Sequence, residues 1–458
     1  MISSNTPSWT EQLLALQGRP ITNQDRQRAT LHLVDWLGSV MLGHHSAAGE
    51  AISRWAAHAS KGACWTVGGQ YLNCESAALS NGSLGNIYEL DDLHRGAVVH
   101  PADTIMAAAL AVAQREKVSP QAFLDAVVRG YEVAIRVGLL AGTPHYQHWY
   151  STATCGVFGA ATACASLLQL DVHQATNALA QAGMQASGVW QCRMESGFSK
   201  QLATGRSAQS GVLAADLASA GLEGPRHILE GQHGWLAATD SMPTKKHAMA
   251  VLTPEAGSPW LIHEVSFKPW PVCRHVHPAI ACAVELHKKI GPVDNIVRIE
   301  ISTYQTALDF ANEPKPITSQ QARFSLQHGV AVALMQGDFW LDDAQPDSLN
   351  LPQLVRLRQH TQVRADKQWN LAYPSHYGAK LRVWLRNGQC IEASQNDAPG
   401  DPENPLSTSE IVEKNQGVMR AANYAPRSIS QLINASTKLP EACSMDDLWD
   451  ALDKLQKV

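Results

Sequence analysis

Residues 205–215 read Gly-Arg-Ser-Ala-Gln-Ser-Gly-Val-Leu-Ala-Ala, and this stretch decides the fold class. Its small residues recur at spacings of 3 and 4, the period of one helix face, and they are Gly205, Ala208, Gly211 and Ala215. Side chains this small let neighbouring helices approach closely. We therefore predict a central helix that other helices cover on several sides.

Helical signals continue on both sides of that stretch, through about the first 260 residues. The segment 22–44 opens with Thr22 as a candidate N-cap, and its apolar residues then recur at spacings of 3 and 4. Further helices are predicted over 75–90, 101–115, 119–140, 155–168, 171–187, 203–220 and 239–250.

The pattern changes after Phe267, where apolar and polar residues begin to alternate. Residues 297–302 and 381–385 alternate in the period of half-buried strands. Asn387-Gly388 separates the second run from a third at 390–393, which predicts a β-hairpin. Helices are predicted between and after the strands, over 278–289, 318–336, 407–420 and 446–456.

These patterns predict a mainly α protein with two domains. A large all-helical domain is expected from the two ends of the chain, residues 1–266 and 396–458. A smaller α+β lid domain is expected to be inserted between them, over residues 267–395. The Pro/Gly/Asn/Asp cluster at 396–405 reads as the linker back to the helical domain.

Composition limits the possible partners. The 458 residues carry 36 Lys and Arg against 41 Asp and Glu, a net charge of −5, which argues against a nucleic-acid binder. Charged residues are 17% and hydrophobic residues 45%, so either the core is large or part of the surface is buried against another subunit. We find neither a secretory signal nor an apolar run of about 18 residues, so no membrane contact is expected. The nine cysteines are scattered, which predicts reduced thiols in a cytoplasm.

One candidate site is the acidic stretch 89–94 followed by His100-Pro101. Proline suits the first turn of a helix, so His100 is predicted at a helix N-terminus. That position favours a neutral imidazole, which could act as a base beside a bound carboxylate. The alternative is a polar loop with a capping histidine.

Two more histidine-bearing segments and one basic segment are candidates. Residues 145–154 hold two histidines, two tyrosines and three hydroxyls, which suits either a pocket wall or an ordinary surface loop. Residues 268–278 open another helix with a His-Pro step. Cys273, His275 and His277 there have zinc-ligand chemistry, but no fourth ligand is identifiable, and no metal site is assigned. The cations that could bind carboxylates are Lys200, Arg206, Lys268 and Arg274.

A set of short motifs occurs in order along the chain. They are Asn81-Gly82, Glu89 to His94, His100-Pro101, Thr152 to Ala161, Lys200 with Gly205 to Ala208, Gly224-Pro225, Lys268 to Pro271, His277-Pro278 and Phe324 to Leu326. The ordered set resembles the MmgE/PrpD family, which includes 2-methylcitrate dehydratases, cis-aconitate decarboxylases and iminodisuccinate epimerases. The resemblance covers nearly the whole chain. It implies the helical domain with a lid, a homodimer, a pocket at the domain interface, and no required metal or organic cofactor.

The resemblance also implies roles for particular residues. The family's catalytic histidine falls on His100, and its two pocket lysines fall on Lys200 and Lys268. Its acidic loop falls on Glu89, Asp91 and Asp92.

Two departures from the family bear on the reaction. Glu89 stands where the acidic loop is expected to begin with aspartate. Tyr150 stands where many members carry a histidine that serves decarboxylation, which weakens the decarboxylase interpretation. His148, two residues away, is a possible substitute.

We expect the chemistry to be proton removal from carbon next to a carboxylate. His100 would move the proton, while Lys200, Lys268 and Arg274 would hold carboxylates and stabilise the enolate-like charge. Tyr150, His148 or an acid from residues 89–92 would protonate a leaving hydroxyl, which makes the protein a dehydratase-type lyase. Further substrate contacts are assigned to Glu89, His94, His148, Ser199, Arg206, Arg274 and His277.

Other functions stay open at this point. Return of the proton to the opposite face of the carbon would make the same site an epimerase. A cis-aconitate-type decarboxylase and a carboxylate-binding protein without activity are the remaining alternatives. In each case the expected partners are a small anionic carboxylate and a second copy of the chain.

Overall fold

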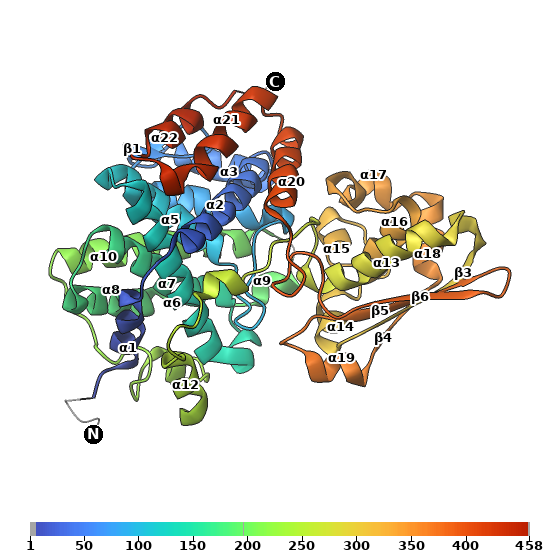
Figure 1. Ribbon diagram of the computed structural model, residues 1–458, viewed down its shortest axis with the longest axis horizontal. Helices are drawn as coiled ribbons and strands as arrows, with labels where there is room; N and C mark the ends of the chain where they lie inside the picture. The colour runs from blue at the N-terminus through green and yellow to red at the C-terminus, as the bar shows by residue number, and fades with distance from the viewer. Residues whose placement is uncertain (1–5, 196, 457–458) are drawn as a thin grey trace. The chain divides into compact units, whose positions relative to one another are not determined.

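The computed structural model describes residues 6–195 and 197–456 (Figure 1). The chain divides into two compact units. Unit 1 comprises Met1–Ile87, Asp91–Val265 and Ser407–Val458, and unit 2 comprises Tyr88–Leu90 and Ser266–Leu406. The sequence placed the borders at 266 and 396 and did not separate residues 88–90 from the helical domain.

Unit 1 is a helical bundle, and its C-terminal helices pack against α2 (Figure 1). Its helices are α1 (Trp9–Ala15), α2 (Asn23–Gly43), α3 (Ala47–Ala56), α4 (Cys74–Gly82), α5 (Pro101–Glu116), α6 (Pro120–Tyr146), α7 (Ser151–Leu167), α8 (Val172–Gln185), α9 (Gln191–Met194), α10 (Ser199–Ser219), α11 (Trp235–Ala238), α12 (Lys245–Leu252), α20 (Thr408–Ala421), α21 (Pro426–Thr437) and α22 (Asp446–Asp453). A two-stranded antiparallel ribbon, β1 (Lys61–Trp65) and β2 (Tyr71–Leu72), also belongs to it.

Helix α10 is the central helix that its small residues predict, and it packs against α4, α5, α7 and α8. A Cβ atom on Gly211 would lie 2.4 Å from Cβ of Ala160, and one on Gly205 would lie 2.4 Å from the carbonyl oxygen of Leu79. Only glycine lets the neighbouring helices come this close. The predicted cap of α2 is also confirmed, because the side chain of Thr22 accepts a hydrogen bond from the backbone of Asp25.

Unit 2 is built on a four-stranded sheet in the order β4-β3-β5-β6. Its strands are β3 (Ile296–Thr303), β4 (Thr361–Ala365), β5 (Ala379–Leu385) and β6 (Cys390–Gln395). Its helices are α13 (His277–Ile290), α14 (Gln305–Ala311), α15 (Ser319–Arg323), α16 (Leu326–Gln336), α17 (Pro346–Leu349), α18 (Pro352–Gln359) and α19 (Lys367–Ala372). The predicted hairpin is confirmed: β5 and β6 pair antiparallel, and Gly388 has a positive φ of 86° between them. Helix α13 packs on β5 and β6, and α16 packs on α13.

The structure corrects several local predictions. The N-terminal part is not all-helical, because it contains the β1–β2 ribbon. The predicted helix 318–336 is two helices, since Ser325 caps α16 by accepting a hydrogen bond from the backbone of His328 at 3.0 Å. Strand β4 and several helices, among them α14, α18, α19 and α21, were not predicted. Strand β4 pairs in parallel with β3, a long-range contact without a local turn signal.

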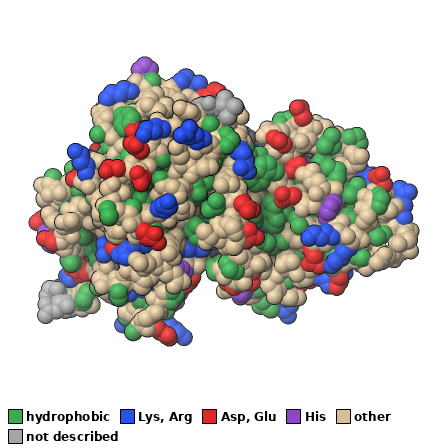
Figure 2. Space-filling model, turned by 45° about the horizontal axis from the view of Figure 1, so that its top comes forward, with side chains coloured by type: hydrophobic (Ala, Val, Ile, Leu, Met, Phe, Trp, Pro, Cys, Tyr) green, Lys and Arg blue, Asp and Glu red, His purple; other side chains and the backbone are tan. Residues whose placement is uncertain are grey.

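Charged side chains are spread thinly over the surface. Figure 2 shows one face, on which both signs are interspersed among uncharged residues. The nine cysteines are free thiols. Across residues 6–195 and 197–456, no helix is long and apolar enough to cross a membrane.

Candidate functional site

His100 immediately precedes α5, and Pro101 occupies the first helical position, as predicted. Nδ1 of His100 lies 2.8 Å from Oδ2 of Asp91, whose side chain is fully buried. The same oxygen accepts a hydrogen bond from Nδ2 of Asn86 at 2.6 Å. A carboxylate held in this way orients the imidazole and leaves Nε2 as the nitrogen that can exchange a proton with a ligand.

Asp92, the next residue, connects three helices. Its Oδ1 accepts a hydrogen bond from the backbone of Ala102 in the first turn of α5, at 3.1 Å. Its Oδ2 accepts one from the hydroxyl of Tyr131 at 2.8 Å and lies 2.8 Å from Nδ1 of His32. We predicted catalytic use of both aspartates, but these contacts and an exposure of 1% point to a positioning role for Asp92.

Burial shifts the pKa values of the groups around Asp92. Burial lowers the pKa of His32, although Asp92 acts in the opposite direction. Burial and the charge of Asp92 raise the pKa of Tyr131 well above its ordinary value. Burial also lowers the pKa of Arg28 to about 10. Tyr131 therefore remains a neutral donor to the carboxylate over the whole physiological range.

The first turns of three long helices are linked near His100. The backbone N–H of His100, before α5, donates to Oγ1 of Thr152 in the first turn of α7, at 3.1 Å. Tyr150 immediately precedes α7 and is buried. Nζ of Lys200, in the first turn of α10, lies 5.7 Å from the centre of the Tyr150 ring. Helix N-termini carry partial positive charge, so three of them beside a lysine form an environment that favours anions.

His145 lies deeper in unit 1, below the start of α7. Its Nε2 is 2.7 Å from Oγ1 of Thr154, and its Nδ1 is 3.2 Å from Oγ of Ser241. Burial lowers the pKa of His145 to about 4. It is therefore a neutral structural histidine that fixes the first turn of α7.

In unit 2, Lys268 is completely buried and its Nζ lies 3.4 Å from Oε2 of Glu89. Glu89 belongs to the tripeptide Tyr88–Leu90, which is part of unit 2 although both flanking segments belong to unit 1. The backbone of Glu89 has a φ of 56°, a region that residues other than glycine seldom adopt. The acidic loop therefore divides: Glu89 pairs with the lysine, while Asp91 and Asp92 serve His100 and α5.

The other predicted residues of unit 2 have structural contacts. Arg274 is buried and forms an ion pair with Asp401. Nδ1 of His275 lies 2.7 Å from the hydroxyl of Tyr304, and Nε2 of His277 lies 3.1 Å from the carbonyl oxygen of Val272. The Cys273-His275-His277 segment is thus engaged in internal contacts that compete with zinc binding.

Of four further predicted residues of unit 1, three are exposed and one is buried. His148 is exposed, so it does not replace the family histidine at the buried position of Tyr150. Arg206 is exposed and donates to Oε1 of Gln209 at 2.6 Å, and Ser199 is exposed at the start of α10. His94 is buried, with Nδ1 accepting a hydrogen bond from the backbone of Ala97 at 3.0 Å, so it shapes the loop before His100.

Sequence reasoning missed two residues. Asn86 holds Asp91, but nothing in its local sequence distinguishes it. Arg323, directly before the Phe324-Ser325-Leu326 motif, is buried in unit 2. Its position as a charged residue beside a family motif is the one signal that could have identified it.

Within the described part of the chain, one group of side chains has the spacing of metal ligands: His376, Asp397 and Glu403 in unit 2. Nδ1 of His376 lies 2.9 Å from Oδ1 of Asp397. Because the group is partly exposed and already paired internally, we assign it no metal.

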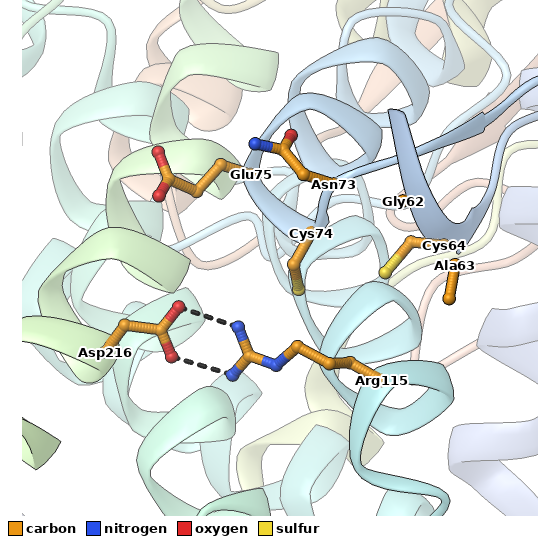
Figure 3. Close-up of a pocket in the computed structure, with 8 residues that line it drawn as sticks. All are labelled: Gly62, Ala63, Cys64, Asn73, Cys74, Glu75, Arg115 and Asp216. Carbon is orange, nitrogen blue, oxygen red and sulfur yellow. Dashed lines mark hydrogen bonds and ion pairs between the residues drawn. The ribbon is translucent and has the colours of Figure 1, made fainter. Parts of the chain in front are cut away.

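A surface pocket of about 360 Å³ lies in unit 1 (Figure 3). Arg115 and Asp216 line it and form a two-pronged ion pair, with both distances 2.7 Å. Cys64 and Cys74 are also part of its wall. Arg115 is in the last turn of α5, about 20 Å from His100 at a rise of about 1.5 Å per residue, so this pocket is separate from the candidate site.

Comparisons with known proteins agree over most of the chain. A family model described as the MmgE/PrpD N-terminal domain matches residues 12–247, and one described as the MmgE/PrpD C-terminal domain matches residues 270–433. The chain is 26% identical over 416 residues to the cis-aconitate decarboxylase-like protein oryM of Aspergillus oryzae, covering 85% of each chain. It is 25% identical over 431 residues to the human cis-aconitate decarboxylase, covering 90% of this chain and 87% of the relative. A cis-aconitate decarboxylase of Aspergillus terreus is 25% identical over 377 residues, covering 77% and 76%.

Proposed function

Because the chain belongs to the MmgE/PrpD family, we propose that it is an enzyme that moves a proton at a carbon next to a carboxylate in a small polycarboxylate. One observation carries the proposal: the linked first turns of α5, α7 and α10 hold His100, Tyr150 and Lys200. They combine an oriented imidazole, a buried phenol and an ammonium group. This set has the parts that acid–base chemistry on an anion needs.

The reaction we favour is dehydration of a hydroxy-polycarboxylate. Nε2 of His100 removes the proton from carbon, and Lys200 with the helix N-termini stabilises the enolate-like charge. The electron pair then forms the double bond as the hydroxyl leaves, protonated by Tyr150 to give water. Lys268 remains a prediction for the same reaction, on the strength of the family resemblance.

Decarboxylation is the second candidate, and the names of the relatives favour it. Here the carbon–carbon bond breaks, CO₂ leaves, and an acid protonates the carbanion. Tyr150 at the family's histidine position disfavours this reaction, as the sequence suggested. Epimerisation would need the proton to return to the opposite face, and a carboxylate-binding protein would perform no proton transfer.

The test follows the reaction by ¹H NMR in D₂O with 2-methylcitrate, citrate, cis-aconitate and tricarballylate. We expect turnover or deuterium incorporation by the wild type and a loss of about 10²–10⁴-fold in His100→Ala. His173→Ala is the matched control, since His173 is an exposed histidine of unit 1. The products distinguish dehydratase, decarboxylase and epimerase.

Two results would contradict the proposal. Full activity in a folded His100→Ala variant would remove the assigned base. Binding of polycarboxylates with neither turnover nor exchange would show a binding protein instead.

We also propose that the enzyme is a cytoplasmic homodimer. The 17% content of charged residues and the free thiols support this proposal. Light scattering coupled to gel filtration measures the mass directly, and a monomer near 49.6 kDa would contradict it.

A further inference from the structure

Arg323, the last residue of α15, is a buried cation with unused donors. Its exposure is 6%, yet neither Nε nor Nη2 has a hydrogen-bond partner among the residues that the structure describes. Buried donors in folded proteins are nearly always paired, because an unpaired one forfeits its hydration. The two vacant donors therefore point to a partner outside the chain.

The identity of the two donors indicates the shape of that partner. Nε and Nη2 lie on one edge of the guanidinium and point in parallel, a fork that matches the two oxygens of a carboxylate. Two other arginines of this protein bind carboxylates through the same edge of the guanidinium. Nε and Nη2 of Arg26 bind the two oxygens of Asp125 at 2.7 and 3.1 Å, and those of Arg226 bind Glu11 at 2.7 and 2.6 Å.

Among the described residues no carboxylate lies within ion-pair distance of Arg323, although the charge of Glu89, which is paired with Lys268, acts on it from further away. Its Cζ lies 4.8 Å from the centre of the Tyr88 ring, which holds the guanidinium plane by a cation–π contact. Two other buried cations of unit 2 are already paired, Lys268 with Glu89 and Arg274 with Asp401. For Arg323 the structure contains no ion pair within the described residues, and burial lowers the pKa of its guanidinium.

We propose that Arg323 binds a carboxylate group of a small polycarboxylate through Nε and Nη2, a ligand class that rests on the proposed function and a role that neither the motifs nor the family resemblance assigned. Tyr88 fixes the plane of the guanidinium, so the fork is oriented before the ligand arrives. A carboxylate at this point would accept hydrogen bonds from the two donors that have no partner among the described residues. Arginine is better suited to the task than lysine because its two donors are held in one plane.

The experiment measures binding of tricarballylate, which has three carboxylates but no hydroxyl group or double bond, by calorimetry at constant ionic strength. Arg323→Met should weaken binding about 100-fold, and Arg323→Lys about 10-fold, because lysine keeps the charge but loses the fork. Arg298→Gln is the matched control. The Arg298 guanidinium also lies over an aromatic ring of unit 2, 4.5 Å from the centre of Trp384, but it is half exposed and paired with Glu300.

Thermal unfolding of the same variants separates ligand binding from a structural role. Removing an unpaired buried cation should leave the Tm of Arg323→Met unchanged or raised. A fall of several degrees in both variants would overturn the proposal, because the donors would then be satisfied within the fold or by water. Wild-type affinity in either variant would also overturn it while leaving the proposed function standing. Failure of the wild type to bind or turn over any polycarboxylate would instead refute the proposed function.

Discussion

Replacing Asp91 by asparagine tests whether a buried carboxylate orients His100. Oδ2 of Asp91 faces two donors, Nδ2 of Asn86 at 2.6 Å and Nδ1 of His100 at 2.8 Å. Both donors meet the same oxygen, which an amide can still supply, but the amide carries no negative charge to stabilise the imidazolium that forms when His100 takes a proton. If the amide instead turns its NH2 toward Nδ1, the imidazole must adopt the other tautomer. In comparable His–Asp pairs this change costs up to about 10⁴-fold in rate. We expect kcat/KM to fall about 10²–10⁴-fold, equivalent to about 3–5 kcal/mol of transition-state stabilisation.

The adjacent Asp92→Asn is the matched comparison, because it makes the same change one residue away. Asp92 holds Tyr131, His32 and the first turn of α5, so its loss should lower the free energy of unfolding by about 3 kcal/mol. Asp91→Asn should lower it by only about 1–2 kcal/mol. Urea unfolding and steady-state kinetics of both variants are the assays.

Two outcomes would refute this reasoning. If Asp91→Asn keeps kcat/KM within about threefold of wild type while folded, the carboxylate does not orient the base. If the two variants lose rate and stability in the same proportion, the separation of roles between neighbouring aspartates is wrong.

Three further predictions follow from buried groups. Lys268→Met should lower the free energy of unfolding by about 3 kcal/mol, because it leaves Glu89 buried without its cation. Adding Glu89→Gln should recover part of the loss. Additive effects of the two substitutions in a double-mutant cycle would contradict the pairing. Burial lowers the pKa of His145 to about 4, so between pH 6.5 and pH 4 the unfolded chain binds a proton at this residue and the folded chain does not. The free energy of unfolding should therefore fall by about 3 kcal/mol as the pH is lowered from about 6.5 to about 4. The same pH dependence of stability in His145→Gln would exclude His145 as its source. Gly211→Ala should cost about 1–3 kcal/mol in thermal or urea unfolding, because its new methyl group would overlap Ala160; a neutral effect would mean that α7 and α10 can separate.

Local chemistry explains the parts of the fold that the sequence predicted. Helix α2 follows from a cap and a period of 3.6, and α5 from the proline after His100. The β5–β6 hairpin follows from Asn387-Gly388, where the turn requires a positive φ. These signals act over a few residues, so they can be recognised before any tertiary contact is known. The parallel pairing of β4 with β3 has no such signal, and it was missed.

For the candidate site too, the sequence predicted some features and only the structure showed others. Residue type and position predicted His100, Lys200 and Lys268 as reactive or anion-binding groups, because a histidine before a helix proline and lysines within motifs can be recognised in the chain itself. What each side chain contacts was decided only by packing. Glu89 and Lys268 are 179 residues apart in sequence, yet they form one buried pair.

Burial was the property that the sequence could least supply. Arg206 and Arg323 are the same residue type, yet Arg206 is exposed and Arg323 is buried. His148 and Tyr150 are two residues apart and both can transfer a proton, yet His148 is exposed and Tyr150 is buried. The sequence by itself indicated most of the long helices, three of the four strands of the unit 2 sheet and the reactive residue types. The tertiary structure alone decided that Asp91 faces His100, that Asp92 anchors α5, and that the fork of Arg323 is left without an internal partner. These outcomes depend on long-range contacts and on the cost of desolvating each charge, and neither is encoded in local spacing.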